Sequence, residues 1–189
     1  NPEDFNGKGI LVVGDLMLAK HIRGNVSRMS PEAPVPILKA EEETFNPGGA
    51  ANLAANLASL GIQVYLSGVV GQDEEGELLI DSLENIDTSC ILKTSKQTIQ
   101  KIRGTSQIRG KHHQHLFRID YEDTSNITSE DEQNLLSLIK EKISQVDAVI
   151  LSDYAKGTLT ENLVKNTISI AKENNKLVTA DCKPMNLEF

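Results

Sequence analysis

The stretch GILVVGD, from Gly9 to Asp15, decides the fold class of this 189-residue chain. It is a short apolar run, rich in β-branched residues and bounded by glycines, which is typical of a buried strand. Strands buried on both faces belong to parallel sheets whose faces are covered by helices. The run therefore predicts a parallel sheet, with Asp15 at the carboxyl end of one strand.

Strand and helix patterns alternate along much of the chain. Short apolar runs predict further strands over residues 64–70, 148–152 and 177–180. Apolar residues at helical spacing predict helices over 50–60, 74–84 and 160–174, and another after the capping signal at 128–132. This alternation predicts an α/β fold with a doubly wound, mostly parallel sheet.

Two segments break the alternation. Residues 35–45 and 98–122 are polar and alternating, and we expect exposed strands that form a flap outside the main sheet. The turn between the later strands holds His112, His113 and His115. No Cys or carboxylate ligands accompany them at set spacings, so we interpret these histidines as a solvated turn and assign no metal.

Composition limits the partners. The net charge of −8 and the isoelectric point near 5.0 give no attraction to nucleic acids or anionic membranes. The apolar runs are far shorter than the roughly 20 residues that span a bilayer, and the N-terminus lacks the features of a secretory signal. Cys90 and Cys182 are interpreted as reduced thiols. We expect a cytoplasmic protein that acts on small molecules.

Aspartates follow several of the predicted strands. Asp15, Asp153 and Asp181 end three of them, and Asp73 lies a few residues after a fourth. Ligands bind at the carboxyl ends of parallel strands, so these carboxylates indicate a site at one edge of the sheet. The alternative is that each aspartate is a turn or cap residue.

A glycine pair opens the first predicted helix. Gly48 and Gly49 would let a ligand approach the backbone amides there, and Asn52 would add a fixed side-chain amide. A tight loop with a buried asparagine is the alternative. The segment from Gly104 to Lys111 is not a P-loop, because its glycine spacing is one residue too long and His112 replaces the required Ser or Thr.

Four motifs together resemble a known family. They are VGDLML (13–18), SRMSPEAPVP (27–36), PGGAAN (47–52) and LSDYAKG (151–157). The chain resembles the ribokinase-like (PfkB) carbohydrate kinases from end to end. The second and fourth motifs are similar to those of the D-glycero-D-manno-heptose 7-phosphate kinases, whereas the third indicates only the superfamily.

The resemblance implies a reaction and an architecture. The reaction is phosphorylation of the anomeric hydroxyl of heptose 7-phosphate to the 1,7-bisphosphate by ATP with Mg²⁺, in ADP-heptose and lipopolysaccharide core synthesis. The architecture is a Rossmann-like, ribokinase-like sheet with a small β-sheet lid, whose segments fall at about 22–45 and 96–122. Such lids often join two copies, so we expect a homodimer.

The resemblance also assigns roles to residues. The residues expected to hold sugar hydroxyls are Asp15, Gly48, Gly49 and Asn52. The residues expected to bind the substrate phosphate are Arg28, Lys101 and Arg103. The residues expected at the phosphoryl-transfer or nucleotide end are Asp153, Lys156, Asp181 and Lys183.

The chain departs from the family pattern in three ways. Ala19 stands where the family usually has a sugar-binding aspartate, and Cys182 stands where these kinases commonly have proline. The Gly-Ala-Gly-Asp helix start that supplies the anion hole and catalytic base is expected beyond Phe189. We therefore interpret residues 1–189 as the N-terminal portion of a kinase domain and assign no catalytic residue within them. The alternatives are a non-catalytic sugar-phosphate-binding or interaction module and a kinase for another sugar.

Overall fold

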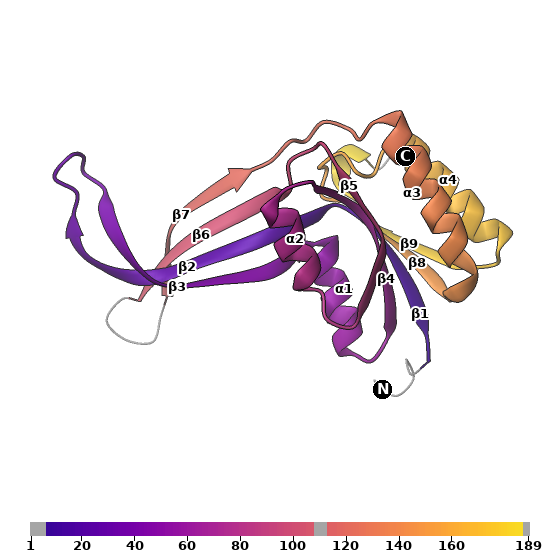
Figure 1. Ribbon diagram of the computed structural model, residues 1–189, viewed down its shortest axis with the longest axis horizontal. Helices are drawn as coiled ribbons and strands as arrows, with labels where there is room; N and C mark the ends of the chain where they lie inside the picture. The colour runs from indigo at the N-terminus through magenta and orange to yellow at the C-terminus, as the bar shows by residue number, and fades with distance from the viewer. Residues whose placement is uncertain (1–6, 108–112, 187–189) are drawn as a thin grey trace.

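The computed structural model describes residues 7–107 and 113–186, which form two β-sheets and four α-helices (Figure 1). The main sheet is wholly parallel, in the order β5-β4-β1-β8-β9. Its strands are β1 (Gly9–Gly14), β4 (Gln63–Gly71), β5 (Ile86–Thr94), β8 (Ala148–Ser152) and β9 (Leu177–Asp181). The predicted parallel sheet is confirmed.

The main sheet is doubly wound around β1. The chain adds β4 and β5 on one side of β1 and later adds β8 and β9 on the other side. Helices α1 (Ala50–Ser59) and α2 (Glu74–Asp81) cover one face, and α3 (Ser129–Lys142) and α4 (Glu161–Glu173) cover the other (Figure 1). The direction in which the chain adds strands therefore reverses next to β1, and α/β folds bind their ligands at such a reversal.

Alternate residues of β1 enter two separate cores. Val12 packs with Leu66 and Ala54 in the core beneath α1 and α2. Leu11 and Val13 pack in the core beneath α3 and α4. Both cores bury side chains completely, which is why the strand reads as a continuous apolar run.

None of the described helices is long and apolar enough to cross a membrane.

The helices begin and end at their sequence signals. The Thr128 side chain accepts a hydrogen bond from the Asp131 amide (3.1 Å), and the Thr160 side chain accepts one from the Leu163 amide (3.0 Å). Gly61, with φ of 84°, follows α1 in the left-handed conformation. The predicted helices are confirmed to within a few residues. One difference is that α2 ends at Asp81 rather than at 84.

The second sheet, which we call the lid, projects from the main sheet (Figure 1). Its order is β3-β2-β6-β7, and only the β2–β6 pair is parallel. Its strands are β2 (Leu16–Met29), β3 (Pro36–Gly49), β6 (Ile99–Gln107) and β7 (His113–Tyr121). A flap outside the main sheet is confirmed, but residues 99–106 of β6 are buried or half-buried rather than exposed, because β6 lies between β2 and β7. The sequence patterns did not predict β2 or β5.

The side chain of Asp73 joins the lid to the main sheet by hydrogen bonds. Its carboxylate accepts hydrogen bonds from the amide (2.8 Å) and hydroxyl (2.6 Å) of Thr98, which immediately precedes β6, and from the Gly76 amide (2.8 Å) in the first turn of α2. Burial alone would raise the pKa of Asp73, but these hydrogen bonds lower it overall. Asp73 therefore caps α2 and anchors the lid.

We expect Asp73→Ala to lower the free energy of unfolding by about 2 kcal/mol, because a cap and a second set of hydrogen bonds are lost together. The pKa of Asp73 is lower in the folded chain, so its contribution is present above the ordinary aspartate range of about 4 and is lost as the pH falls below it. Urea unfolding at pH 7 and at pH 3 would test both points.

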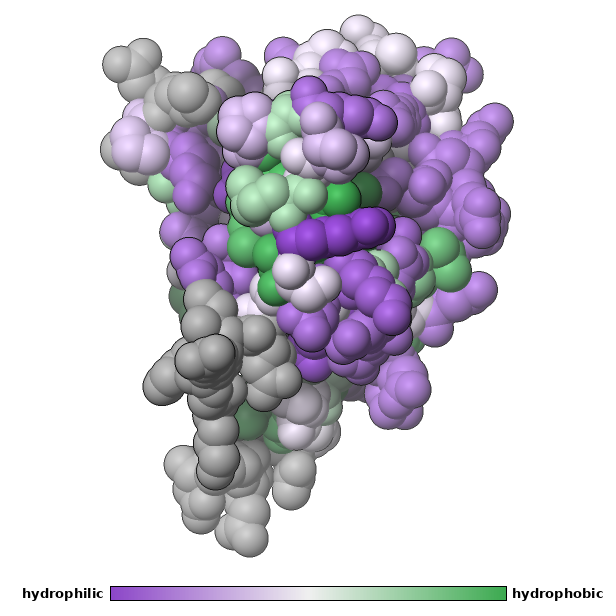
Figure 2. Space-filling view, turned by 90° about the vertical axis from the view of Figure 1, so that its left-hand side faces the viewer, coloured by the Kyte–Doolittle hydropathy of each residue, from purple (hydrophilic) through white to green (hydrophobic). Residues whose placement is uncertain are grey.

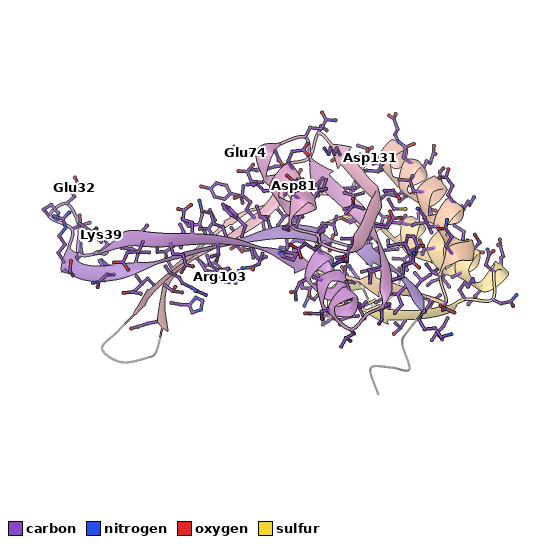
Figure 3. The ribbon with its side chains drawn as sticks, turned by 60° about the horizontal axis from the view of Figure 1, so that its bottom comes forward. Glu32, Lys39, Glu74, Asp81, Arg103 and Asp131 are labelled. Carbon is purple, nitrogen blue, oxygen red and sulfur yellow. The ribbon has the colours of Figure 1, made fainter. Side chains whose placement is uncertain are left out.

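Asp81→Ala is the matched control, because Asp81 is an exposed carboxylate at the other end of the same helix (Figure 3). Its unfolding free energy should stay within about 0.5 kcal/mol of wild type. Equal losses in both variants would contradict the anchoring role of Asp73.

Candidate functional site

A pocket of about 440 Å³ opens between the lid and the start of α1. It lies beside the carboxyl end of β1, near the reversal of strand order. The residues that line it are Met17, Ala19, His21, Pro47, Gly48, Gly49, Asn52, Lys101, Arg103, Arg118 and Tyr154. The lid thus supplies one wall of the pocket, and the glycine turn with α1 supplies another.

Backbone geometry requires the two glycines of this turn. Gly49 has φ of 59°, and a Cβ there would lie 2.4 Å from the carbonyl oxygen of Asp15. A Cβ on Gly48 would lie 2.8 Å from the Cγ of Met17. Any side chain would therefore push the turn away from β2, and Asn52 in the next helical turn would leave the pocket wall.

The cationic residues of the lid wall come together through strand register. Ala19 pairs with Lys101, and His21 pairs with Arg103, across β2 and β6. Residues two apart on a strand share a face, so all four side chains lie on the face that lines the pocket. The structure therefore brings together five residues that the sequence resemblance indicated, namely Gly48, Gly49, Asn52, Lys101 and Arg103.

Arg28 is not part of this group. It is exposed near the far end of β2, opposite Ile37, and does not line the pocket. A 14-residue strand carries it well beyond the pocket residues at the base of the lid. The pocket instead contains Arg118 of β7, which lies directly opposite Arg103. His21 and Tyr154 are the other polar pocket residues that sequence reasoning missed.

Asp15 lies beneath the pocket rather than in its wall. Its side chain is fully buried, with 0% exposure. One carboxylate oxygen accepts hydrogen bonds from the amides of Tyr154 (2.8 Å) and Lys156 (3.1 Å), and the other accepts one from the Thr158 amide (3.0 Å). Asp15 therefore fixes the loop after β8 and places Tyr154 at the pocket.

Asp153 organises the segment after β9. Its side chain accepts hydrogen bonds from the amides of Ala155 (2.7 Å) and Lys183 (3.1 Å) and from the side chain of Asn186 (2.8 Å). The Lys183 ammonium lies 5.3 Å from the centre of the Tyr154 ring, which is the range of a cation–π contact. This segment thus reaches the pocket edge through Tyr154.

The four strand-end carboxylates do not form one cluster. Asp15 and Asp153 follow adjacent strands, and Asp181 is exposed at the end of β9. Asp73 is the N-cap of α2, in agreement with the alternative that these aspartates are turn or cap residues, because a helix N-terminus needs hydrogen-bond acceptors. Lys156 forms an ion pair with Glu122 at 2.7 Å, just after the lid strand β7.

Curated proteins match nearly the whole chain. The pfkB family of carbohydrate kinases matches residues 8–188. The bifunctional protein HldE of Helicobacter pylori (strain Shi470) is 45% identical over 179 residues, covering 93% of this chain and 38% of that protein. The bifunctional protein HldE of Caulobacter vibrioides is 40% identical over 185 residues, covering 96% of this chain and 37% of that protein.

Solved structures share the fold. A possible 1-phosphofructokinase from Thermotoga maritima has a TM-score of 0.70 at 21% identity, covering 95% of this chain and 55% of that chain. Ribokinase of Arabidopsis thaliana, complexed with ribose and ATP, has a TM-score of 0.61 at 14% identity, covering 92% of this chain and 53% of that chain. The fold is therefore of the ribokinase-like class.

The chain belongs to the pfkB family of carbohydrate kinases. It spans less than two fifths of the length of the HldE proteins that it matches. Kinases of this family use ATP, generally with Mg²⁺. Within residues 7–107 and 113–186, no three His, Cys, Asp or Glu side chains are gathered as a metal site, and Asp153 is occupied by its own hydrogen bonds.

We expect Asp15→Asn to destabilise the loop after β8, because an Asn amide group would face a backbone N–H and leave a buried donor without an acceptor. The free energy of unfolding should fall by about 1.5 to 3 kcal/mol. Hydrogen exchange at the Tyr154, Lys156 and Thr158 amides should become faster.

Asp147→Asn is the matched control. Asp147 also accepts a backbone hydrogen bond, from Gly9 at 2.8 Å, but its side chain is 51% exposed. Water can replace the lost interaction there, so we expect a change below about 1 kcal/mol. Unchanged exchange in the 154–158 loop of Asp15→Asn would contradict the role given to Asp15.

Proposed function

We propose that the full-length protein phosphorylates the anomeric hydroxyl of D-glycero-D-manno-heptose 7-phosphate, using ATP and Mg²⁺, to give the 1,7-bisphosphate for ADP-heptose and lipopolysaccharide core synthesis. The observation that carries this proposal is the composition of the pocket. One wall offers the Gly48–Gly49 turn and Asn52 for hydroxyls, and the other offers Lys101 and Arg103 for a phosphate. A phosphorylated sugar needs both walls. We place the reaction in the cytoplasm, where ATP is available.

Each part of the pocket has a task in this proposal. Asn52 and the amides of the glycine turn bind sugar hydroxyls, and Lys101 and Arg103 hold the substrate phosphate by charge-assisted hydrogen bonds. Asp15 holds the Tyr154–Thr158 loop and thereby completes the hydroxyl side. The groups proposed for the nucleotide end are Asp153, Lys156, Asp181 and Lys183. Positioning and charge neutralisation supply most of the catalysis in phosphoryl transfer, and Mg²⁺ would contribute neutralisation when bound with ATP.

Ala19 motivates two alternatives. Its methyl group lies in the pocket wall between Asn46 and Lys101, and it cannot accept a hydrogen bond from a sugar. A kinase for another sugar would use the same chemistry on a substrate that lacks a hydroxyl at this point. A sugar-phosphate-binding module without catalysis would keep the pocket and lose the reaction.

We expect Asn52→Ala in the full-length protein to raise the KM for heptose 7-phosphate about 3- to 10-fold, because one hydrogen bond to a hydroxyl is lost. Asn56→Ala is the matched control, since Asn56 is exposed one turn further along α1 and lies outside the pocket. A coupled assay of ADP release measures both. Equal KM values in the two variants would contradict the placement of the sugar.

The same assay separates the alternatives. Turnover with heptose 7-phosphate but not with other sugar phosphates supports the proposed reaction. Turnover only with another sugar supports a kinase for that other sugar. Binding of heptose 7-phosphate in calorimetry without ADP release from the full-length protein supports the binding module.

We also propose that the lid joins two copies of the chain. The face opposite the pocket carries Phe45, Phe117, Ile119 and Tyr121, each more than a third exposed. Figure 2, which views the molecule from the lid side, shows apolar side chains gathered between hydrophilic ones on this end. Exposed apolar faces of this kind mark association surfaces.

We expect Ile119→Lys to convert a homodimer to monomers, because it places a charge in the middle of the apolar face. Lys39→Gln, on the exposed far end of β3, should leave the dimer intact. Sedimentation equilibrium of the full-length protein gives the molar mass. A wild-type monomer at micromolar concentration would refute the proposed assembly.

A further inference from the structure

The chain that leaves the lid packs against the loop after β8. Residues 122–128, which we call the return segment, run back from the end of β7 to the start of α3 (Figure 1). The Ile127 amide donates a hydrogen bond to the carbonyl oxygen of Gly157 at 3.0 Å. A side chain at Gly157 would collide with the carbonyl oxygen of Ser125. The return segment therefore lies directly against the Tyr154–Thr158 loop.

Lys156 of that loop is held at both of its ends. Its amide donates a hydrogen bond to the buried carboxylate of Asp15 at 3.1 Å. The residues on either side, Ala155 and Gly157, have φ of 54° and 88°, so the backbone turns sharply around Lys156. Its side chain is 17% exposed, and its ammonium forms an ion pair with Glu122 of the return segment at 2.7 Å. Asp15 thus fixes the backbone of Lys156, and Glu122 fixes the direction of its side chain.

Within the described part of the chain, Glu122 is the only carboxylate at ion-pair distance from the Lys156 ammonium. The two nearby strand-end carboxylates are engaged elsewhere. Asp15 accepts three backbone hydrogen bonds, and Asp153 accepts two more and one from a side chain. An ammonium that is largely withdrawn from water needs a counter-charge. Without Glu122, the Lys156 side chain would gain by turning toward solvent.

The same carboxylate reaches the lid wall of the pocket. The Oε2 atom of Glu122, which pairs with Lys156, lies 3.9 Å from the Nζ of Lys101. Lys101 lines the pocket, and its nearer partner is Asp120 at 3.3 Å. One oxygen therefore lies between an ammonium of the pocket wall and an ammonium of the loop after β8. Because Lys101 keeps Asp120, the loss of Glu122 would act mainly on Lys156.

We propose that Glu122 is a positioning residue, which holds the Lys156 ammonium in place for phosphoryl transfer and ties that placement to the lid. The inference rests on the proposed function and deepens it, because it names the group that orients a lysine assigned to the phosphoryl-transfer end. Glu122 touches neither sugar nor nucleotide in this proposal. Neutralisation of the transferred group matters most in the transition state, so the effect of Glu122 falls on kcat rather than on the KM for the sugar.

The kinetic test uses the full-length protein. We expect Glu122→Ala to lower kcat roughly 10- to 100-fold, the loss that a misplacement of about 1 Å can cause, and to change the KM for heptose 7-phosphate less than about 3-fold. Glu42→Ala is the matched control. Glu42 also pairs with a cation of the lid, Arg23 at 3.4 Å, but its side chain is 55% exposed and lies outside the pocket. Its kcat should stay within about 2-fold of wild type.

A double-mutant cycle separates positioning from a general effect on the lid. Two residues that act as one unit have non-additive effects. Once Lys156 is replaced by alanine, Glu122→Ala should therefore cause no further loss of kcat. An equal loss in the wild-type and Lys156→Ala backgrounds would overturn the proposal, and so would a Lys156→Ala variant with the kcat of wild type.

Chemical labelling tests the placement of Lys156 without turnover. Trace acetylation of the full-length protein by acetic anhydride, read by mass spectrometry, compares lysines within one sample. We expect acetylation of Lys156 to become about 3- to 10-fold faster in Glu122→Ala, the effect of removing one hydrogen bond. Glu122→Gln keeps the shape of the side chain and should change the rate in the same direction. Lys39, which is exposed on β3, is the internal reference and should be labelled at the same rate in every variant.

The two kinds of measurement fail separately. If labelling of Lys156 rises as described but the full-length protein releases no ADP with any sugar, the positioning by Glu122 stands and the proposed reaction falls. If ADP is released with heptose 7-phosphate but Lys156 is labelled at the wild-type rate in both Glu122 variants, the reaction stands and the positioning falls.

Discussion

The buried carboxylate of Asp15 is the interaction on which the candidate site depends. A charge removed from water is costly unless hydrogen bonds replace its hydration, and three backbone amides of the loop after β8 do so here. The main chain of Asp15 also accepts a hydrogen bond from Ala50 at 2.9 Å, which begins α1. One residue therefore joins β1, α1 and the Tyr154–Thr158 loop, so the floor of the pocket and one wall move together.

The lid has two chemically different faces because its strands alternate. Lys101 and Arg103 point to the pocket, whereas Ile102 between them belongs to the opposite face, with Phe45 and Tyr121. A single strand therefore presents cationic side chains to the pocket on one side and an apolar side chain on the other. A shift of one residue in the β2–β6 register would exchange the two faces. The Asp73–Thr98 hydrogen bonds hold β6 at its base, which helps to fix that register.

The main sheet was well predicted from the sequence, because strands that are buried on both faces consist of continuous apolar runs. The sequence patterns did not predict β2, because Leu16, Met17 and Leu18 are buried like a core strand while most of the remaining strand is half-buried or exposed. The pocket glycines and Asn52 were predictable from local spacing. Arg118 was not, because its approach to Arg103 depends on the β6–β7 register. A carboxylate such as Asp73 looks the same in sequence whether it meets a ligand or a helix N-terminus.

The charge of the whole chain and the charge of its pocket have opposite signs, and both matter for recognition. A net charge of −8 repels large polyanions, which meet the whole surface. A small anion inside the pocket responds mostly to groups within about one Debye length, roughly 8 to 10 Å at physiological salt. The lid wall contributes the cations of Lys101, Arg103 and Arg118, whereas the carboxylate of Asp15 beneath the pocket is engaged by three backbone amides. The electrostatic interaction of an anion with this chain therefore depends on whether the anion meets the whole surface or the pocket alone.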